Sequence, residues 1–412
     1  MLSLTNELLE LSLLPQEGER ESRWEYSIYL RKIRPASLTC RRLREVLSPH
    51  IYRHIVFFQY SIVRYAALLD LTPTYGQFIT EFSFCAPAEP SDFYHLMKIV
   101  AARFKDLAHL KLLTLNIQGS PDSLRWMSTM TRKQDLKHWG DFWCALPAVC
   151  QLTVRGGEWN FLCRGFAVAN HPSVRTIGFH DTLPIEMRLK DALLFNRAFT
   201  SLTCISFPGS FCPNEEWIAT AFAGCRLESI TLGSETHYCN EPCLWDEGVS
   251  RLLSLSSSSL SSLTIRSTMA LNLASEHTIL PCLSTLKFQG IHFNDDEEKL
   301  EDLLQGFLKS PLQHLSLDNC MGVPRSLVSW FDPTKQNWPG LKSLSLLGLC
   351  VESDPQIALE EFDEEEIALM DDGAADGVCW DFRSRCQLED FCNVRGISLD
   401  PLGWYEFEGY GA

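Results

Sequence analysis

The chain has 412 residues, more than most single globular domains, and its hydrophobic and charged contents of 45% and 21% are ordinary for a folded protein. Its longest apolar runs, such as 55–58 and 66–69, fall far short of the roughly 20 residues that a membrane-spanning helix needs. The formal net charge of −16 gives no attraction for nucleic acid phosphates, so neither a membrane nor a nucleic acid is expected as a partner.

Residues 1–55 have the pattern of a small helical module. A polar interruption at 15–22 separates two helical segments, and a third segment has apolar residues at helical spacing. These residues are Leu38, Leu43 and Leu47. The N-terminus carries Glu7 and Glu10 without a basic leader, so we expect no secretory signal.

Three stretches of this module resemble an F-box, the helical module by which substrate receptors dock on the Skp adaptor of cullin–RING ubiquitin ligases. They are 4–9 with the sequence LTNELL, 37–44 with SLTCRRLR, and 48–53 with SPHIYR. The first stretch departs from the family pattern, because Leu4-Thr5 stands where Leu-Pro is usual and the interruption at 15–22 follows. The resemblance implies that the following residues contact the adaptor: Leu4, Leu8, Leu9, Leu38, Cys40, Arg41 and Leu43.

An alternative reading of the same module needs no adaptor. Terminal units of a repeat array need one apolar face and one polar face, and an amphipathic helix supplies both. The module would then be only a cap, or a degenerate F-box, on the repeats behind it.

A helical link is expected over 56–71, and beyond it one six-residue phrase recurs along the chain. In the copy at 312–317, LQHLSL, the first, fourth and sixth positions are apolar, as they are in every copy. The eleven copies begin at Ile79, Leu110, Val149, Val174, Leu202, Leu227, Leu260, Leu283, Leu312, Leu341 and Val394. Most of the steps between them lie in or near the period of about 20–29 residues that is typical of leucine-rich repeats.

Each copy predicts a short β-strand whose fourth and sixth residues point to the same side. One strand cannot bury that side alone, but stacked parallel strands can when a helix returns the chain behind each of them. Helical spacing in the return segments is clearest at 96–104, 217–222 and 300–307. The sequence therefore predicts an α/β leucine-rich-repeat solenoid with a parallel concave β-sheet over 56–412, preceded by the helical module at 1–55.

Two features make the predicted solenoid irregular. The ninth position of the repeat, usually Asn or Cys, fits only at Cys320. Two long insertions are expected at 117–148 and 348–393, and the second contains eleven acids and no Lys or Arg over 352–376. Because like charges repel and burying them unpaired is costly, we expect 352–376 to be a solvated, disordered loop, and the alternative is a binding segment for a basic partner.

The third, fifth and seventh positions of the phrase point to one side of the predicted sheet. This side is the expected binding surface. The fifth position is Ser or Thr in nine of eleven copies, which keeps that side uncrowded. Larger polar residues in this and neighbouring positions could reach a protein substrate. They are Arg155, His180, Arg266, Lys287, Gln289, His314 and Asp318.

No enzyme motif occurs in the sequence, so no catalytic residue, metal or cofactor is expected. His237, Cys239 and Cys243 lie close together but lack the second pair of a zinc site. The sixteen cysteines include no Cys-x-x-Cys pair, which favours reduced thiols in the cytoplasm or nucleus. The sequence as a whole favours a substrate-recognition subunit of a Skp–cullin–F-box ubiquitin ligase, and the alternative is a non-catalytic binding scaffold.

Overall fold

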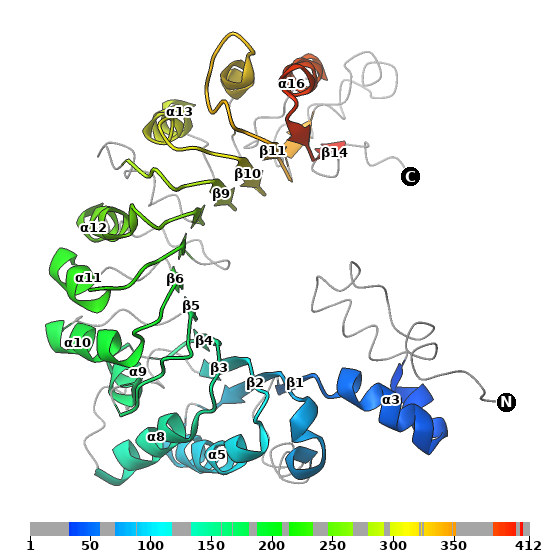
Figure 1. Cartoon of the computed structure of the whole chain (residues 1–412), viewed down its shortest axis with the longest axis vertical. Coiled ribbons are helices and arrows are strands. Elements are labelled where there is room, and N and C mark those ends of the chain that lie inside the picture. Colours follow the sequence, from blue (N-terminus) through cyan, green and yellow to red (C-terminus); the bar gives the residue numbers. More distant parts are fainter. Residues whose placement is uncertain are drawn as a thin grey trace, which may run out of the picture. The chain divides into compact units, whose positions relative to one another are not determined.

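The computed structural model describes residues 33–57, 71–87, 89–117, 133–157, 159–166, 168–180, 188–207, 214–233, 246–266, 279–291, 297–320, 323, 325–347, 349–351, 382–400 and 404–406. The chain divides into two compact units, Met1–Val174 (unit 1) and Arg175–Ala412 (unit 2). Each unit repeats one arrangement, a parallel strand followed by a helical return (Figure 1).

Unit 1 begins, within the described residues, with helical residues 33–39 and helix α3 (Arg41–Ile51). Cys40 caps α3, because its sulfur accepts a hydrogen bond from the Leu43 N–H at 3.5 Å. Ile33, Leu47 and Ile51 form a small apolar core, against which Ala36 and Tyr52 pack. The third predicted segment of the N-terminal module is therefore helical, and its first two segments lie almost wholly outside the described residues.

The sheet of unit 1 has four parallel strands in chain order. They are β1 (His54–Phe57), β2 (Glu81–Ala86), β3 (Leu112–Ile117) and β4 (Gln151–Arg155). The register follows the repeated phrase, since Phe82 pairs with Leu113 and Leu113 with Leu152. Strand β1 includes Val56 and Phe57 and pairs with β2, so the helical link that the sequence predicts at 56–71 is wrong at its start.

The returns of unit 1 bring a large aromatic cluster behind its sheet. They are η2 (Gly76–Phe78), α5 (Pro90–Arg103), η3 (Phe104–Asp106), α8 (Lys133–Ala145) and α9 (Trp159–Phe166). Trp139 and Phe161 stack with centroids 4.6 Å apart, and the Trp139 indole N–H donates to the Phe161 carbonyl at 3.0 Å. The prediction that 117–148 is an insertion is wrong for its second half, because Trp139 and Trp143 on α8 are fully buried core residues.

His171 lies beside this cluster and makes the stability of unit 1 depend on pH. Its ring meets that of Trp143 at a centroid distance of 5.9 Å, and burial lowers the pKa of His171 to about 4. An unfolded histidine titrates near 6.5, so the unfolded state binds this proton first as the pH falls. The stability that the neutral ring contributes is complete above about pH 6.5 and is lost as the pH falls towards 4.

We therefore expect the unfolding free energy of unit 1 to fall by roughly 2–3 kcal/mol between pH 7 and pH 4.5 through this group alone. Urea titrations of the wild type and of His171→Gln at both pH values measure the difference. The pH-induced loss should be smaller in the variant by about 2 kcal/mol, and an identical loss in the two proteins would contradict this assignment.

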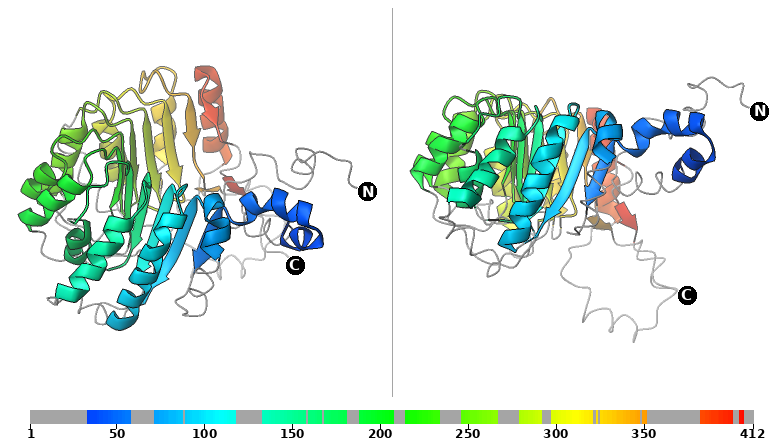
Figure 2. Two further views of the ribbon diagram at one scale, coloured as in Figure 1. Left: turned by 60° about the horizontal axis from the view of Figure 1, so that its bottom comes forward. Right: turned by 90° about the horizontal axis from the view of Figure 1, so that it is seen from below.

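Unit 2 continues the pattern with eight parallel strands in chain order (Figure 2). They are β5 (Thr176–His180), β6 (Cys204–Phe207), β7 (Ser229–Leu232), β8 (Ser262–Ile265), β9 (Thr285–Gln289), β10 (His314–Asp318), β11 (Ser343–Ser345) and β13 (Ser398–Leu399). The returns are α10 (Leu189–Ala198), α11 (Glu215–Ala221), α12 (Asp246–Ser256), α13 (Glu297–Gly306), η5 (Arg325–Phe331) and α16 (Phe382–Arg395). A separate pair, β12 (Leu349–Val351) and β14 (Trp404–Glu406), lies outside the main sheet.

The last predicted copy of the phrase, which starts at Val394, is out of register. Val394 belongs to α16 and is 73% exposed, while Leu399 pairs with Leu344 of β11. The phrase predicts instead that Ile397, two residues earlier in the chain, pairs with Leu344. A shift of two residues keeps every side chain on the same face of a strand, so apolar alternation alone does not detect it.

Cys320 is the one residue that matches the usual ninth position of the repeat, and it closes the turn after β10. Its thiol is 1% exposed and lies 3.6 Å from the Asp318 carbonyl, to which it donates. Burial raises its pKa to about 12, partly offset by hydrogen bonds from the backbone of Ile291 and Gly290. Cys320 thus joins its own turn to the turn after β9.

In strands such as β4, β8 and β10, the fourth and sixth residues of the phrase are buried, as predicted. Leu152 and Val154 in β4, Leu263 and Ile265 in β8, and Leu315 and Leu317 in β10 are at most 1% exposed. The predicted α/β fold class with a parallel sheet is confirmed, and so are the helical returns at α5, α11 and α13. Among the described helices, none is both long and apolar enough to span a bilayer.

Candidate functional site

The candidate site lies on the open face of unit 2, defined as the side of its sheet opposite the helices (Figure 1). The third, fifth and seventh positions of the phrase point to this face because the fourth and sixth point inward. Lys287 and Gln289 of β9 and Asp318 of β10 occupy these positions. Strand register therefore brings together residues that are about 30 positions apart in the sequence.

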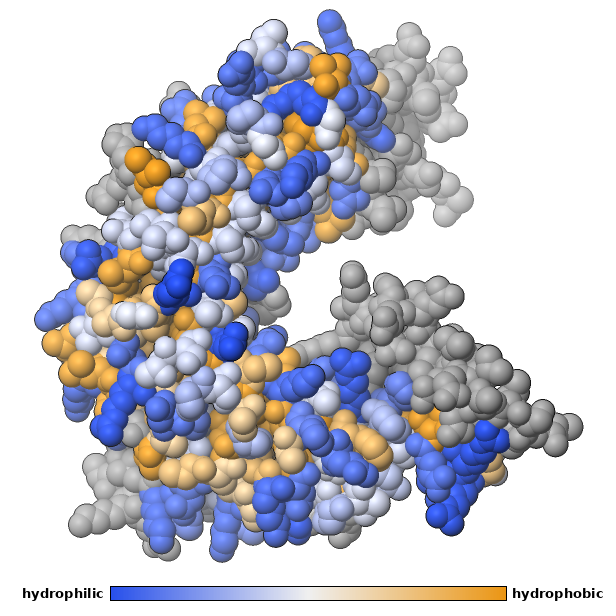
Figure 3. All heavy atoms as spheres, viewed as in Figure 1, coloured by the Kyte–Doolittle hydropathy of each residue, from blue (hydrophilic) through white to orange (hydrophobic). Residues whose placement is uncertain are grey.

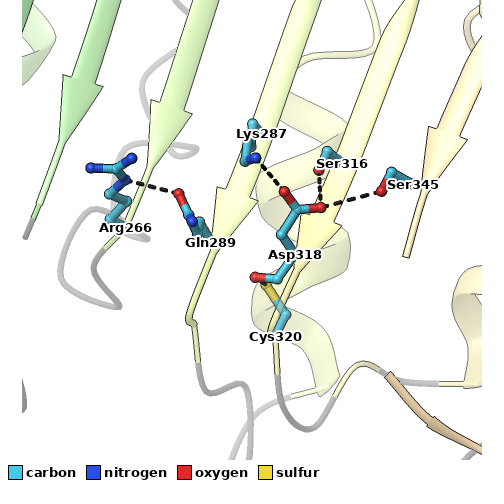
Figure 4. Close-up of polar contacts among 7 residues, drawn as sticks. All are labelled: Arg266, Lys287, Gln289, Ser316, Asp318, Cys320 and Ser345. Carbon is cyan, nitrogen blue, oxygen red and sulfur yellow. Dashed lines mark hydrogen bonds and ion pairs between the residues drawn. The ribbon is translucent and has the colours of Figure 1, made fainter. Parts of the chain in front are cut away.

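A carboxylate organises the centre of this site (Figure 4). Asp318 Oδ2 forms an ion pair with the Lys287 ammonium. Its Oδ1 accepts hydrogen bonds from the Ser316 hydroxyl and, at 3.3 Å, from the Ser345 hydroxyl. The side chain of Asp318 is 9% exposed and that of Lys287 is 35% exposed. The carboxylate is thus enclosed by donors from three strands, while the ammonium keeps contact with solvent.

A second polar pair lies beside this network. The Arg266 Nε–H, just after β8, donates to the Gln289 side-chain oxygen at 2.9 Å. Figure 4 shows the two side chains reaching toward each other from neighbouring strands, next to Lys287. We call Arg266, Lys287, Gln289, Ser316, Asp318 and Ser345 the polar network.

The other predicted substrate-binding residues lie apart from the polar network. His314 begins β10 and its Nδ1 lies 2.7 Å from the Ser343 hydroxyl on β11. His180 ends β5 in the same unit, and Arg155 ends β4 in unit 1. The structure therefore groups Arg266, Lys287, Gln289 and Asp318. Ser316 and Ser345 were expected only as two of the small residues at the fifth position of the phrase.

Small side chains occupy the third and fifth positions of the open face from β5 to β8. At the third and fifth positions these strands carry Thr176, Gly178, Cys204, Ser206, Ser229, Thr231, Ser262 and Thr264. No residue in this set is larger than threonine, so another chain can approach the sheet closely. We call this set the small-residue floor.

Unit 1 contains a histidine–serine–glutamate group that the sequence did not suggest. His54 Nε2 lies 3.4 Å from the Ser83 hydroxyl, and His54 Nδ1 lies 3.8 Å from Glu81 Oε2. The second distance is too long for a hydrogen bond, and Ser83 is only 6% exposed. A nucleophilic serine needs a base held by a third group and access to a substrate. We therefore assign this group no catalytic role.

The residues expected to contact the Skp adaptor are described only in part. Leu4, Leu8 and Leu9 lie outside the described residues. Leu38 is 74% exposed, and the side chain of Arg41 is 91% exposed and paired with Glu45. Cys40 and Leu43 are half-buried. Strongly hydrophilic side chains cover α3 in Figure 3.

In the part of the chain that the structure describes, no group of three or more His, Cys, Asp or Glu side chains could hold a metal ion. The sequence segment with His237, Cys239 and Cys243 lies outside that part.

The parallel strands, the helical returns and the alternating burial define the class of fold, which is an α/β solenoid of the leucine-rich-repeat type. No family model matches the chain, and no curated protein matches its sequence. Among solved structures, the chain is similar to the leucine-rich repeat-containing protein LegL7 from Legionella pneumophila. The identity is 12%, the match covers 79% of this chain and 92% of that chain, and the TM-score is 0.37.

Proposed function

We propose that this chain is the substrate-recognition subunit of a Skp–cullin–F-box ubiquitin ligase. Its N-terminal module would dock on the Skp adaptor, and through the adaptor on the cullin, while the open face of the repeats would hold a protein substrate. The observation that carries the proposal is the exposure of Leu38, at 74%, on a helical module that already has its own core.

The apolar residues of the module are divided between two roles. Ile33, Leu47 and Ile51 turn inward and pack against each other. Leu38 takes no part in that core, although it lies on the same run of helices. Burying one leucine side chain against a partner is worth roughly 1.5–3 kcal/mol, so an exposed leucine beside Arg41 is a suitable anchor for a docking partner.

Such a subunit carries out no chemistry of its own. It raises the effective concentration of a bound substrate near the ubiquitin-loaded enzyme, and the gain depends on both partners being held at once. The proposal places the chain in the cytoplasm and/or nucleus, where buried thiols such as Cys163 and Cys392 stay reduced.

The proposal is tested by co-purification of the full chain with the Skp adaptor. We expect the wild type to retain the adaptor and Leu38→Asp to retain at least tenfold less, because a carboxylate cannot be buried unpaired at an apolar contact. The matched control is Leu193→Asp on α10, which makes the same change at a leucine that is 58% exposed in unit 2. A wild type that retains no adaptor would end the ligase proposal, and equal losses in the two variants would remove Leu38 from the contact.

A non-catalytic binding scaffold is the second candidate, and one observation favours it. The Cys40 side chain caps α3, so it has a structural role that accounts for its presence without an adaptor. In that case the module would serve as the N-terminal cap of the repeats, and the open face would bind its partner without a ligase. Absence of the adaptor together with recovery of another specific protein would support this candidate.

A further inference from the structure

We infer that the outer face of helix α10 in unit 2 binds a partner protein through an amphipathic helix of that partner, whose apolar residues are flanked by acids. Helix α10 lies on the helical side of the sheet, away from the open face (Figure 1). Its exposed residues are Leu189, Lys190, Leu193 and Arg197, and we call these four residues the α10 face. The inference goes beyond the proposed function, because neither the N-terminal module nor the open face takes part in it.

The sequence of α10 divides its residues between two opposite sides. Successive residues are about 100° apart around a helix axis, so Leu189, Leu193 and Arg197 follow one another along one side. Lys190 lies beside Leu193, three residues before it. The opposite side packs into unit 2, and its buried residues are Asp191, Ala192, Phe195 and Ala198. Asp191, the one acid of α10, is 3% exposed, so the α10 face contains cations and leucines but no acid.

The two leucines of the α10 face are exposed side by side. Leu189 is 41% exposed and Leu193 is 58% exposed. Among the exposed residues that the structure describes on α11, α12 and α13, none is large and apolar. A single exposed leucine needs no explanation, but two on adjacent turns form a continuous apolar spot of the kind that a partner covers.

The two cations of the α10 face are available to a partner. Lys190 and Arg197 are exposed, and neither forms an ion pair in the part of the chain that the structure describes. The neighbouring helix α11 has two exposed acids, Glu215 and Glu216, and Glu215 pairs with Arg251 of α12 at 3.7 Å. Axes of packed helices are about 8–10 Å apart, which is about one Debye length at physiological salt. The acids of α11 therefore compensate the cations of α10 only weakly.

A partner helix with leucines between acids complements both parts of the α10 face. Its apolar side chains pack against Leu189 and Leu193, and its carboxylates lie beside Lys190 and Arg197. Paired helices commonly combine an apolar seam with flanking opposite charges in this way. Leu189 and Arg197 are about 12 Å apart along the axis, so the contact is two turns long.

An anionic membrane is the other surface that attracts leucines and cations together. The chain as a whole carries a formal net charge of −16, which opposes its approach to an extended anionic surface. A single partner helix meets only the charges within about one Debye length of it. Membrane binding also grows with the apolar area that is buried, and here that area is two leucines. An acidic protein helix is therefore the better match.

The test uses a fluorescein-labelled peptide of about 20 residues, long enough to form a helix, with leucines along one side, glutamates beside them and alanines elsewhere. Matched peptides carry glutamine or lysine in place of glutamate, and the anisotropy of each is titrated with the full chain. We expect the glutamate peptide to bind at least fivefold more tightly than the glutamine peptide, and less tightly as salt is added. Lys190→Glu/Arg197→Glu should reverse the preference, so that the lysine peptide binds best.

A matched pair of variants locates the contact. Leu193→Gln/Arg197→Gln should weaken binding of the glutamate peptide at least fivefold. Leu308→Gln/Lys309→Gln makes a similar change at two exposed residues of the same unit and should leave the affinity unchanged. Circular dichroism checks that all variants are folded, and adaptor co-purification is expected to be unaffected by them.

Four results would each overturn the inference. They are equal binding of the glutamate and glutamine peptides, no reversal of preference in Lys190→Glu/Arg197→Glu, equal losses in the two glutamine variants, and tighter binding of a peptide with the chain's own acidic sequence 352–376. Flotation with vesicles that contain phosphatidylserine tests the membrane alternative. Vesicle binding that Lys190→Glu/Arg197→Glu abolishes would assign the α10 face to a membrane instead.

Discussion

Replacing Gly165 by alanine is expected to destabilise unit 1 by about 3 kcal/mol. A β-carbon at this position of α9 would lie 2.2 Å from the indole nitrogen of Trp143 and 2.3 Å from that of Trp139. Both tryptophans are fully buried, so neither ring can swing into solvent to make room. Forcing one extra carbon into a packed core costs about 1–3 kcal/mol, and two clashes with rigid rings place this site at the upper end.

The control for this prediction is Gly140→Ala on the neighbouring helix α8. Its β-carbon would meet the methyl groups of Val168 at 3.2 and 3.3 Å, and Val168 is 53% exposed and free to shift. Alanine is also favoured over glycine in a helix by about 1 kcal/mol. Chemical unfolding should therefore show a change within about 1 kcal/mol for this variant. Similar losses in the two variants would show that Gly165 is not enclosed by the two indoles.

The repeated phrase predicts most of the sheet because its physical basis is local. In each copy the fourth and sixth residues must be buried and lie two positions apart, so the sequence alone indicates where a strand runs and which side faces the helices. The returns at α5, α11 and α13 are equally visible, because helical spacing repeats over two or three turns.

Two errors come from features that the phrase does not encode. Strand β1 has no fully buried residue, so no apolar alternation reveals it. Tryptophans at 139 and 143 look the same in sequence whether their helix belongs to the stack or to an insertion. Only the contact between α8 and its neighbours, such as the stacking of Trp139 on Phe161, decides between these two alternatives.

The polar network could be predicted only in part. Periodicity places Arg266, Lys287, Gln289 and Asp318 on one face, and the structure brings these four together. The enclosure of Asp318 by Lys287, Ser316 and Ser345 depends on side-chain conformations on three strands. Considered one strand at a time, the sequence places Asp318 on the surface, where a partner could bind it. In the structure its carboxylate is buried among the donors of the polar network.

The central claim is that alternate residues of repeat strands such as β4, β8 and β10 face a packed core and an open surface. Leu263 and Thr264 are neighbours in β8, and Leu263 is 0% exposed while Thr264 lies on the open face. Leu263→Ala should lower the free energy of unfolding by about 2–5 kcal/mol, because it leaves a cavity between sheet and helices. Thr264→Ala should change it by less than about 0.5 kcal/mol, because it removes one half-exposed side chain.

Urea unfolding of the wild type and these two variants, followed by circular dichroism, is the most direct measurement of that claim. The account predicts a large loss for Leu263→Ala and almost none for Thr264→Ala. Equal losses, or a larger loss for Thr264→Ala, would contradict both the strand assignment and the open face on which the binding proposals depend.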